Sequence, residues 1–556
     1  MAESALARGG AYLDAVRGLR PRQVAHRPTR LVPPRLLAAG LRDTDPPAWR
    51  PLGADAGLDS APQSGPAAPP HRTGAFEAVG LTRPADAPGI WSSRDVSDLL
   101  FTFTVHAFDE LPRYLAGERD REGDAFWELV LRDWLRRCSV PALPGWHPYP
   151  LARRVVAWCA ALSAGGWDPE LERALLQSAT RQVRYLRRCV EHDVGGNHVL
   201  EEAVALAIGG TCLGDRRVAE HGRRLLTHEL AQQVLDDGGH LERSPSYHRR
   251  VLDRLLDAEQ VFERAGDPLP HVDRACREMT HWLHALAGPD GHVPLLNDGW
   301  EGPSIDPAAG ELTNLAATGY VVLRHGGDQA VLDVGALCPP HLPPHAHADA
   351  LSFVTWTDAA PVVMDPGSGA YQGDARRWSR ATGSHNTVEV DGEDQCIFLG
   401  DFRAARLPNV TCERLERRAD AVIVTAGHDG YRRLSDPVDH RRVFCWLPGD
   451  GLVVVDVLRA GAAHTTRSRL HLAPGADDAP VSIRPLFGAR GERTTGRAAP
   501  YLGTFSTCVV LEQQGDTAQR AVQGWSLLRS EADVRREGDE VVIERPHGEP
   551  VRFALA

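Results

Sequence analysis

The hydrophobic pattern of this 556-residue chain changes its period near residue 300, and that change restricts the folds open to it. Before this point, segments such as LERALLQSATRQVRYLRRCV carry apolar residues at the i, i+3, i+4 spacing of an amphipathic helix. After it, GYVVLRHGGDQAVLDVGAL alternates around a Gly-Gly turn as a β-hairpin does, and many short apolar segments follow. We therefore predict a helical part followed by a β part.

The helical part consists of repeated hairpins joined by short loops that contain Gly or Pro, a pattern typical of a bundle, a solenoid or an (α/α) toroid. The many short strand candidates after it are typical of an antiparallel β-sandwich. The fold class is then α+β and multidomain. We predict an irregular, partly helical N-terminal arm at 1–90, a helical domain at 91–310 and a sandwich at 311–556.

One helix allows a more detailed prediction, because its apolar residues are large. In DAFWELVLRDWLRRC (124–138), we expect Phe126, Leu129, Val130 and Trp134 to share the face that packs on the core.

Charge and composition exclude several functions. The formal net charge of −12 argues against a nucleic-acid binder, and an acidic substrate would need a local patch of arginines. The printed sequence contains no lysine, which excludes Schiff-base chemistry, pyridoxal-phosphate anchoring and the phosphate-loop lysine. We expect no organic cofactor.

Two further expectations concern the location of the protein. No stretch of 18 apolar residues occurs and no secretory signal is recognisable, so we expect neither a membrane span nor Sec export. The ten cysteines are scattered without a CxxC pair, as expected of reduced thiols in the cytoplasm. The sequence leaves the oligomeric state open.

Two clusters of polar residues lie in the helical part. In Gly195-Gly196-Asn197-His198, Asn197 could simply be a helix N-cap, and His198 with Glu201 could be either a coupled pair or a surface pair. In the segment from Gly238 to His248, Ser244 and Pro245 are explained by helix initiation. Tyr247 would then lie in the first turn, where the helix dipole stabilises a phenolate.

A third cluster lies in the β part and is the densest. His345 and His347 form an HxH pair at the expected entry to a strand, so both imidazoles would point to the same side. Asp365 and His385 follow in the same domain. Imidazole and carboxylate are donors that zinc prefers.

These residues resemble the heparinase II/III-like lyases. The segments HAHADALSFVTW, APVVMDPGSGAY and RRWSRATGSHNTVEVDGEDQ resemble the sandwich domain of that family. The segments GGNHVLEEAVAL, DGGHLERSPSYH and PDGHVPLLNDGW resemble successive landmarks of its toroid. The resemblance implies an (α/α) toroid followed by an antiparallel sandwich, and a carbon–oxygen lyase that performs β-elimination at a uronic acid of an acidic polysaccharide.

The resemblance also implies roles for single residues. Asn197 would contact the C6 carboxylate, Tyr247 would act as base or acid, His345 would be its partner and His198 a second candidate base. Glu201 and, less directly, Arg243 would bind substrate. A structural zinc would be held by His347, Asp365 and His385.

The elimination chemistry needs these residue types. A donor such as Asn197, aimed at the developing enolate, lowers the barrier to removal of the weakly acidic C5 proton. An ionised tyrosine at neutral pH costs roughly 4 kcal/mol unless its site stabilises it, so either Tyr247 or a histidine could be the base.

Three alternatives stay open at this point. They are a non-catalytic glycan-binding member of the same scaffold, a toroid glycoside hydrolase with two carboxylates across the sugar, and a sandwich metalloenzyme with an open metal position.

Overall fold

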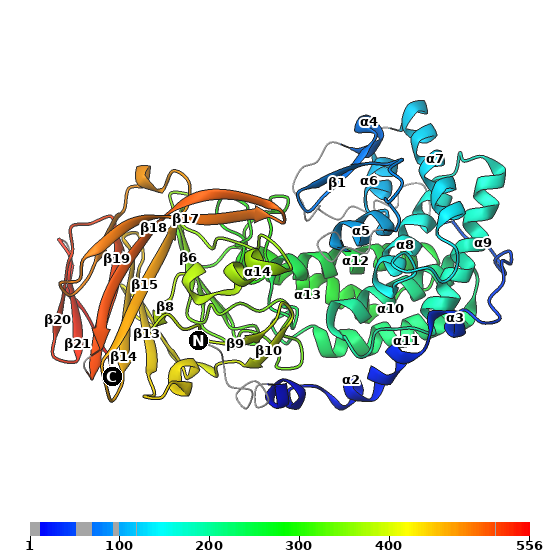
Figure 1. Cartoon of the computed structure of the whole chain (residues 1–556). Coiled ribbons are helices and arrows are strands. Elements are labelled where there is room, and N and C mark those ends of the chain that lie inside the picture. The colour runs from blue at the N-terminus through cyan, green and yellow to red at the C-terminus, as the bar shows by residue number, and fades with distance from the viewer. Residues whose placement is uncertain are drawn as a thin grey trace. The chain divides into compact units, whose positions relative to one another are not determined.

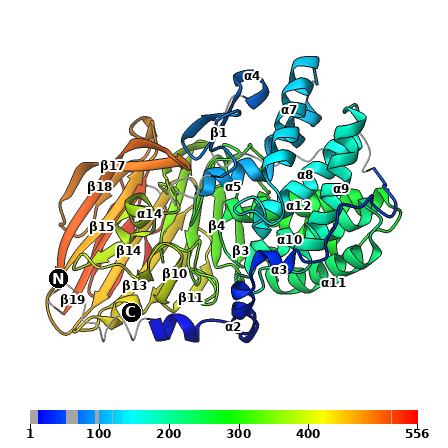
Figure 2. The same ribbon diagram turned by 45° about the vertical axis from the view of Figure 1, so that its right-hand side comes forward.

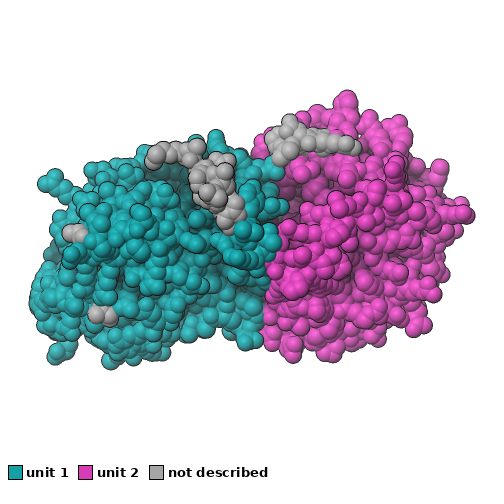
Figure 3. Space-filling model, turned by 60° about the horizontal axis from the view of Figure 1, so that its bottom comes forward, with its two compact units in different colours: residues 1–18, 235–246, 281–556 teal, residues 19–234, 247–280 magenta. Residues whose placement is uncertain are grey.

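A computed structural model describes residues 12–51, 69–92, 99–117, 119–517, 519–546 and 548–555. The chain divides into two compact units (Figure 3). Unit 1 contains 1–18, 235–246 and 281–556, and unit 2 contains 19–234 and 247–280. These units divide the chain differently from the predicted domains, because unit 1 takes two segments from within the helical part of the sequence.

Unit 2 is helical (Figure 1). Its arm carries α2 (Pro21–His26), η1 (Arg27–Leu31), α3 (Pro34–Leu37), α4 (Pro70–Thr73), β1 (Ala75–Ala78) and β2 (Leu81–Pro84). Its longer elements are α5 (Leu99–Ala107), α6 (Glu110–Ala116), α7 (Arg121–Arg137), α8 (Pro148–Ala164), α9 (Pro169–Leu186), α10 (Gly196–Cys212), α11 (Arg216–Gln233), α12 (Pro245–Arg264) and α13 (Pro270–Leu286), of which α12 and α13 each have one end in unit 1.

Helix α10 lies at the centre of this unit, where it packs against α8, α9 and α11. Nearly every residue of α10 is buried, as expected of a helix that is apolar on all sides. Glycines allow its backbone to approach α11 closely. A Cβ on Gly210 would lie 2.3 Å from the amide nitrogen of Ala219, and one on Gly222 would lie 2.3 Å from that of Ala207.

Helix α7 corrects one sequence prediction. Its buried face consists of Trp127, Val130, Leu131 and Trp134, whereas Leu129 is 70% exposed. The predicted face and the observed one both satisfy helical spacing, because α7 is apolar on more than one side. The bulkier side chain of Trp127 takes the core position, and Leu129 is left to solvent.

Unit 1 is built from antiparallel strands (Figure 2). One sheet contains β3 (Leu312–Leu315), β4 (Tyr320–His325), β5 (Asp328–Asp333), β6 (Phe353–Thr357), β7 (Ala360–Val363), β8 (Val388–Val390), β15 (His464–Leu472), β17 (Gly491–Tyr501) and β18 (Thr504–Thr517). A second contains β11 (Val410–Arg417), β12 (Val422–His428), β13 (Asp439–Leu447), β14 (Gly451–Arg459), β16 (Ser482–Pro485) and β19 (Arg520–Leu528). A third contains β20 (Asp533–Glu537), β21 (Glu540–Glu544) and β22 (Val551–Ala554).

Short elements complete unit 1. They are β9 (Ile397–Leu399) paired with β10 (Arg403–Arg406), helix α14 (Gly373–Arg380), and the 3-10 turns η3 (Thr382–Ser384), η4 (Gly430–Arg433) and η5 (Ala476–Asp478).

The three sheets form layers, and the side chains of β14 in the second sheet contribute to the cores on both of its faces. Leu452 and Val454 belong to the core shared with the first sheet, whereas Val453 and Val455 belong to the core shared with the third. Side chains alternate across a strand, so β14 is buried on both faces and its sequence is almost continuously apolar. The predicted order of helices followed by an antiparallel sandwich is confirmed, with a third layer added.

Further expectations can be compared with the described residues. The hairpin of β4 and β5 turns at Gly326-Gly327 as predicted. All ten cysteines are free thiols. No helix in the described ranges is long and apolar enough to span a membrane. The expectation for 1–90 lies partly outside the described residues.

Candidate functional site

The carboxylate of Asp298 organises the polar residues of unit 1. It is fully buried and accepts hydrogen bonds from His345 Nδ1 (2.8 Å), His347 Nε2 (3.0 Å) and Ser368 Oγ (3.0 Å). The guanidinium of Arg376, also buried, donates to the same carboxylate. Although burial alone opposes ionisation, Arg376 and the two imidazoles hold the pKa of Asp298 well below its usual range. Asp298 is therefore a fixed negative charge.

His345 lies between two carboxylates. Its Nδ1–H donates to Asp298, and its Nε2 lies 3.3 Å from Oε2 of Glu242, which is also buried. The bond to Asp298 fixes the tautomer, so Nε2 is the atom through which His345 can exchange a proton. His345 and His347, the predicted HxH pair, thus both bond to the carboxylate of Asp298. They lie in a loop and not on a strand.

A short backbone segment holds these side chains in place. Asn297 has a left-handed conformation (φ +58°), and its Oδ1 accepts the amide N–H of His347 (3.0 Å). Its Nδ2 donates to the carbonyl of Arg243 (3.1 Å), which also accepts the hydroxyl of Tyr320 (2.7 Å). The segment before α12, the segment at 297–298 and the HxH loop are therefore joined within unit 1.

Arg243 itself is half-buried, and its guanidinium donates to the backbone carbonyls of Ala317 (3.3 Å) and Ala336. These bonds connect strand ends of unit 1. The structure therefore shows a supporting contact for Arg243, and its predicted contribution to substrate binding stays a prediction.

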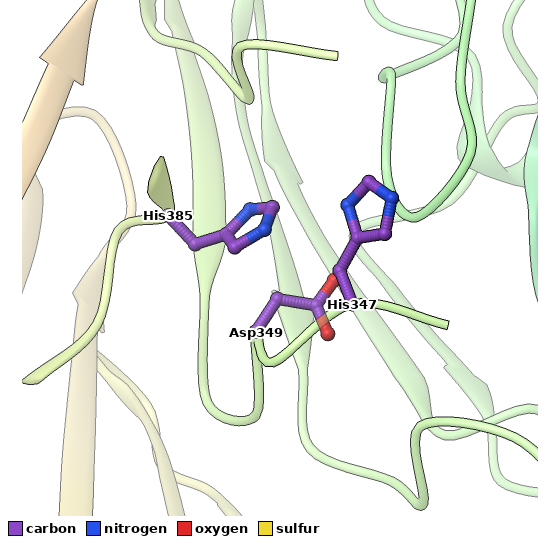
Figure 4. Close-up of side chains that lie close together, drawn as sticks. All are labelled: His347, Asp349 and His385. Carbon is purple, nitrogen blue, oxygen red and sulfur yellow. The ribbon is translucent and has the colours of Figure 1, made fainter. Parts of the chain in front are cut away.

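Close to Asp298, three buried side chains could hold a metal ion. One ligand atom each from His347, Asp349 and His385 lie within 4.8 Å of one another (Figure 4). Because His347 uses Nε2–H for Asp298, its Nδ1 keeps the lone pair, and that buried nitrogen has no hydrogen-bond partner in the described part of the chain. Both buried oxygens of Asp349 likewise lack a partner of ordinary geometry. Unsatisfied buried atoms at this density indicate a place for a cation.

Asp365, the carboxylate predicted as a zinc ligand, accepts a hydrogen bond from His385 Nδ1 (2.9 Å). His385 Nε2 donates to the carbonyl of Ser379 (3.0 Å). Burial opposes the charge on His385, but Asp365 outweighs it and raises the pKa of the imidazole to about 9. A metal ion would replace one of these protons. The two imidazoles and the carboxylate of Asp349 form a donor set that fits zinc.

In unit 2, α10 presents Asn197 and His198 at its start. The N-cap is Gly195, whose φ of +79° suits glycine, so the alternative reading of Asn197 as N-cap is wrong. Asn197 lies inside the first turn and is buried.

His198 is held by two contacts. Its Nδ1 lies 3.0 Å from Oε2 of Glu191, and its ring stacks on Tyr149 with 4.2 Å between centroids. His147 Nε2 lies 3.6 Å from the other oxygen of Glu191. Although burial opposes ionisation of Glu191, the two histidines lower its pKa to about 2. This carboxylate orients His198 so that Nε2 is available for proton transfer.

Glu201 has a different partner from His198, although the two lie on one helix. It is buried, and its Oε1 accepts from Arg153 (2.8 Å), which also donates to Asp109 (2.9 Å). The alternative of a surface pair with His198 is therefore wrong.

Tyr247 lies in the first turn of α12, which begins at Pro245 as predicted. Its side chain is 6% exposed. In unit 1, the preceding Ser244 and Ser246 donate to the carbonyls of Asp298 (2.7 Å) and Trp300 (3.0 Å). The start of α12 is thus fixed in position.

Two family models together match residues 111–549 of the chain. The model described as "Heparinase II/III N-terminus" matches residues 111–310, and the one described as "Heparinase II/III-like, C-terminal" matches residues 307–549. The chain belongs to the heparinase II/III-like family. Membership places it among the polysaccharide lyases.

The relatives of this heparinase II/III-like chain include an FtsZ-localized protein and several heparin-sulfate lyases. FtsZ-localized protein C of Caulobacter vibrioides (strain NA1000 / CB15N) is 29% identical over 413 residues, which are 69% of this chain and 68% of the relative. A heparin-sulfate lyase of Pedobacter heparinus is 23% identical over 322 residues, 49% of this chain and 48% of the enzyme. A heparin-sulfate lyase of Bacteroides thetaiotaomicron is 28% identical over 196 residues, which are 31% of this chain and 28% of the enzyme. The matches to these two lyases thus cover less than half of each enzyme.

Solved structures confirm the fold. Heparinase III superposes with a TM-score of 0.69 at 16% identity, covering 94% of this chain and 95% of that one. A mutant of the heparan sulfate lyase HepC from Pedobacter heparinus superposes with a TM-score of 0.62 at 16% identity, covering 91% and 92%. The toroid-plus-sandwich fold predicted for the heparinase II/III-like chain is therefore confirmed.

Five residues of this heparinase II/III-like site were given no predicted role: Glu191, Glu242, Asp298, Asp349 and Arg376. Glu242 lies between His240 and His248 in a segment that carries the family resemblance, so a search for carboxylates beside the histidines would have found it. Glu191 lies seven residues before His198 and has no local pattern of its own.

Proposed function

We propose that the chain cleaves a glycan containing uronic acid by β-elimination and leaves a 4,5-unsaturated uronate on one product. Family membership supports a polysaccharide lyase. The observation that carries the mechanism is His345, an imidazole whose tautomer is fixed by one buried carboxylate and whose Nε2 faces another. Such a group can give or take a proton through Nε2.

In the proposed reaction, a base removes the C5 proton of the uronate and the released electron pair forms the C4=C5 double bond. The C4–O4 bond breaks, and an acid protonates the departing O4. Tyr247 serves as base or acid, with His345 as its partner, and His198 is the second candidate base. Asn197 donates to the C6 carboxylate, where negative charge accumulates in the transition state.

Asp298 and Glu191 support the two histidines. Each carboxylate bonds to the Nδ1 of its histidine, at 2.8 Å and 3.0 Å respectively, and so directs Nε2 toward the reaction. A carboxylate behind an imidazole also stabilises the imidazolium that forms on proton uptake.

We also propose a structural zinc in unit 1. His347 and His385 would hold it together with Asp349 or Asp365, and it would cross-link the HxH loop to the segment after α14. Bound there, zinc would fix the loop that presents His345 without itself touching the sugar.

The proposed substrate is acidic, as the heparin-sulfate lyases among the relatives suggest, although their matches are partial. The free cysteines support action in a reducing compartment, and we propose the cytoplasm, with an imported or biosynthetic oligosaccharide as substrate. A panel of heparan sulfate, hyaluronan, chondroitin, alginate and polygalacturonate, read by ultraviolet absorbance of the unsaturated product, tests both reaction and substrate. New reducing ends without this absorbance would indicate hydrolysis instead.

The variant Tyr247→Phe tests the mechanism. We expect loss of turnover with the fold intact, because the ring stays and only the proton-transferring hydroxyl is removed. Tyr185→Phe is the control, since Tyr185 is a buried tyrosine of the same unit on α9, outside the proposed site. Near-wild-type rates for Tyr247→Phe would refute the assignment.

The name of the Caulobacter relative describes where that protein is found, not a reaction. This favours a second candidate, an accessory glycan-binding protein built on the lyase scaffold. Calorimetric binding of a panel glycan without unsaturated product would support this candidate over the lyase.

A further inference from the structure

Three arginines of unit 2 surround the buried carboxylate of Glu201. Arg153 donates to Glu201 (2.8 Å) and to Asp109 (2.9 Å), so two carboxylates hold it. Arg254 lies 3.5 Å from Glu201 and donates to Asp257 (2.7 Å).

Arg250 differs from the other two. Its nearest carboxylate oxygen is that of Glu201, at 3.8 Å from Nε, which is too long for a hydrogen bond. Its side chain is only 11% exposed, and the buried Nε has no hydrogen-bond partner in the described part of the chain. A buried N–H without a hydrogen bond is costly, and a ligand that accepts from it would remove this cost.

The surroundings of Arg250 are those of the proposed site. Its guanidinium carbon lies 5.7 Å from the centroid of Tyr149, whose ring stacks on His198. On α12, Arg250 comes three residues after Tyr247, which places both on the same side of the helix. Arg250 thus lies over the ring that stacks on a candidate base, and it is one turn from the candidate phenol.

The charge around it also favours an anion. Burial raises the pKa of Asp257 to about 7, and the hydrogen bond of this carboxylate is with Arg254, so Asp257 leaves the charge of Arg250 available to a ligand. The whole chain carries a formal charge of −12, which makes a local positive group necessary for an acidic ligand.

We infer that Arg250 binds an acidic group of the glycan, a carboxylate or a sulfate ester, through the paired N–H groups of its guanidinium. The planar guanidinium matches either oxyanion with two parallel hydrogen bonds. The inference rests on the proposed function, because it names the residue that selects an acidic substrate at that site.

Binding calorimetry tests it. The parent protein carries Tyr247→Phe so that the sugar is not consumed, and Arg250→Gln is added. The probes are a hyaluronan hexasaccharide, which has carboxylates only, a heparan sulfate hexasaccharide, which has carboxylates and sulfates, and a carboxyl-reduced hyaluronan hexasaccharide. Arg249→Gln is the matched control, since it removes the same charge from the adjacent position of α12.

We expect Arg250→Gln to weaken binding of an acidic probe about ten-fold or more, and Arg249→Gln to change it less than two-fold. Weaker binding of hyaluronan identifies the carboxylate as the bound group, and weaker binding of heparan sulfate alone identifies the sulfate. The carboxyl-reduced probe should show no dependence on Arg250.

Equal binding by Arg250→Gln and its parent, equal losses in both arginine variants, or no binding of either acidic probe would overturn the inference. If Arg250→Gln does not fold, Arg250→Lys replaces it, because lysine keeps the charge but lacks the paired donors. Weaker binding then supports the inference and unchanged binding overturns it. If the protein forms product but binding does not depend on Arg250, only this inference is rejected. If binding depends on Arg250 but no product ever forms, only the proposed lyase activity is rejected.

Discussion

Replacing Asp298 by Asn should damage both stability and activity, because one carboxylate supports a buried arginine and two histidines. The substitution keeps the shape but removes the negative charge that faces Arg376. Leaving one member of a buried ion pair uncompensated costs about 3–5 kcal/mol. Arg376 keeps its bonds to the carbonyls of Pro344 and Asp401, so we expect the lower end of this range. For a unit of this size, that lowers Tm by about 5–10 °C.

The effect on activity follows from hydrogen-bond geometry. The amide oxygen of Asn can take the place of Oδ1, which serves three donors, and the NH₂ group then faces His345 Nδ1. His345 must then accept a hydrogen bond at Nδ1 and carry its proton on Nε2. This is the opposite tautomer to the one that Asp298 fixes. We expect turnover to fall roughly 10²–10⁴-fold, as for other enzymes in which the base is held in the wrong tautomer.

Calorimetric melting and the product absorbance assay measure the two effects separately. Asp306→Asn is the control, because Asp306 is an exposed aspartate in the same unit. A variant Asp298→Asn that melts within 2 °C of wild type (roughly 1 kcal/mol or less) and keeps its turnover would refute the assignment of Asp298 as the organising charge.

The remaining predictions concern the metal, the acid stability and the helical core. His347→Ala should lose bound zinc, measured by atomic absorption, and lower the Tm of unit 1; unchanged zinc content and Tm would contradict the proposed site. Arg442 and His440 overcome burial and lower the pKa of Asp456 to about 2, so its stabilisation of about 2 kcal/mol is complete above pH 4 and is lost as pH falls toward 2. Asp456→Asn should therefore flatten acid melting curves between pH 5 and 2, and curves as steep as wild type would count against this. Trp127→Ala should cost about 3–5 kcal/mol in denaturant unfolding and the exposed Leu129→Ala at most about 0.5 kcal/mol; equal costs would contradict the observed face of α7.

The sequence predicted the order of the fold because hydrophobic period is a local property. Alternation placed the hairpin of β4 and β5 with its turn, and helical spacing placed α7 through α12. The predicted face of α7 was right for Val130 and Trp134 and wrong for Leu129, because two sets of apolar residues satisfied the same spacing. The third sheet was not predicted, because alternation shows that one face of a strand is buried but not which layer covers it.

The candidate site was proposed from histidines, a tyrosine and an asparagine, which stand out as motifs. Their carboxylate partners did not stand out. Asp298 lies 47 residues before His345 and 49 before His347, and a single aspartate in a loop carries no pattern that indicates either contact. Asp349 was missed for a related reason, because the HAHAD motif drew attention to the histidines alone.

The segmented course of the chain through its two units has a practical consequence. Residues 235–246 and 281–300 precede the strands, yet they belong to unit 1 and contribute Glu242 and Asp298 to its polar centre. A recombinant fragment beginning at 311 would therefore carry His345 and His347 without the carboxylates that hold them, and one ending at 310 would carry those carboxylates without the histidines. A division at this point separates the two histidines from the carboxylates that hold them, so dissection of this protein has to proceed by point substitution in the full chain.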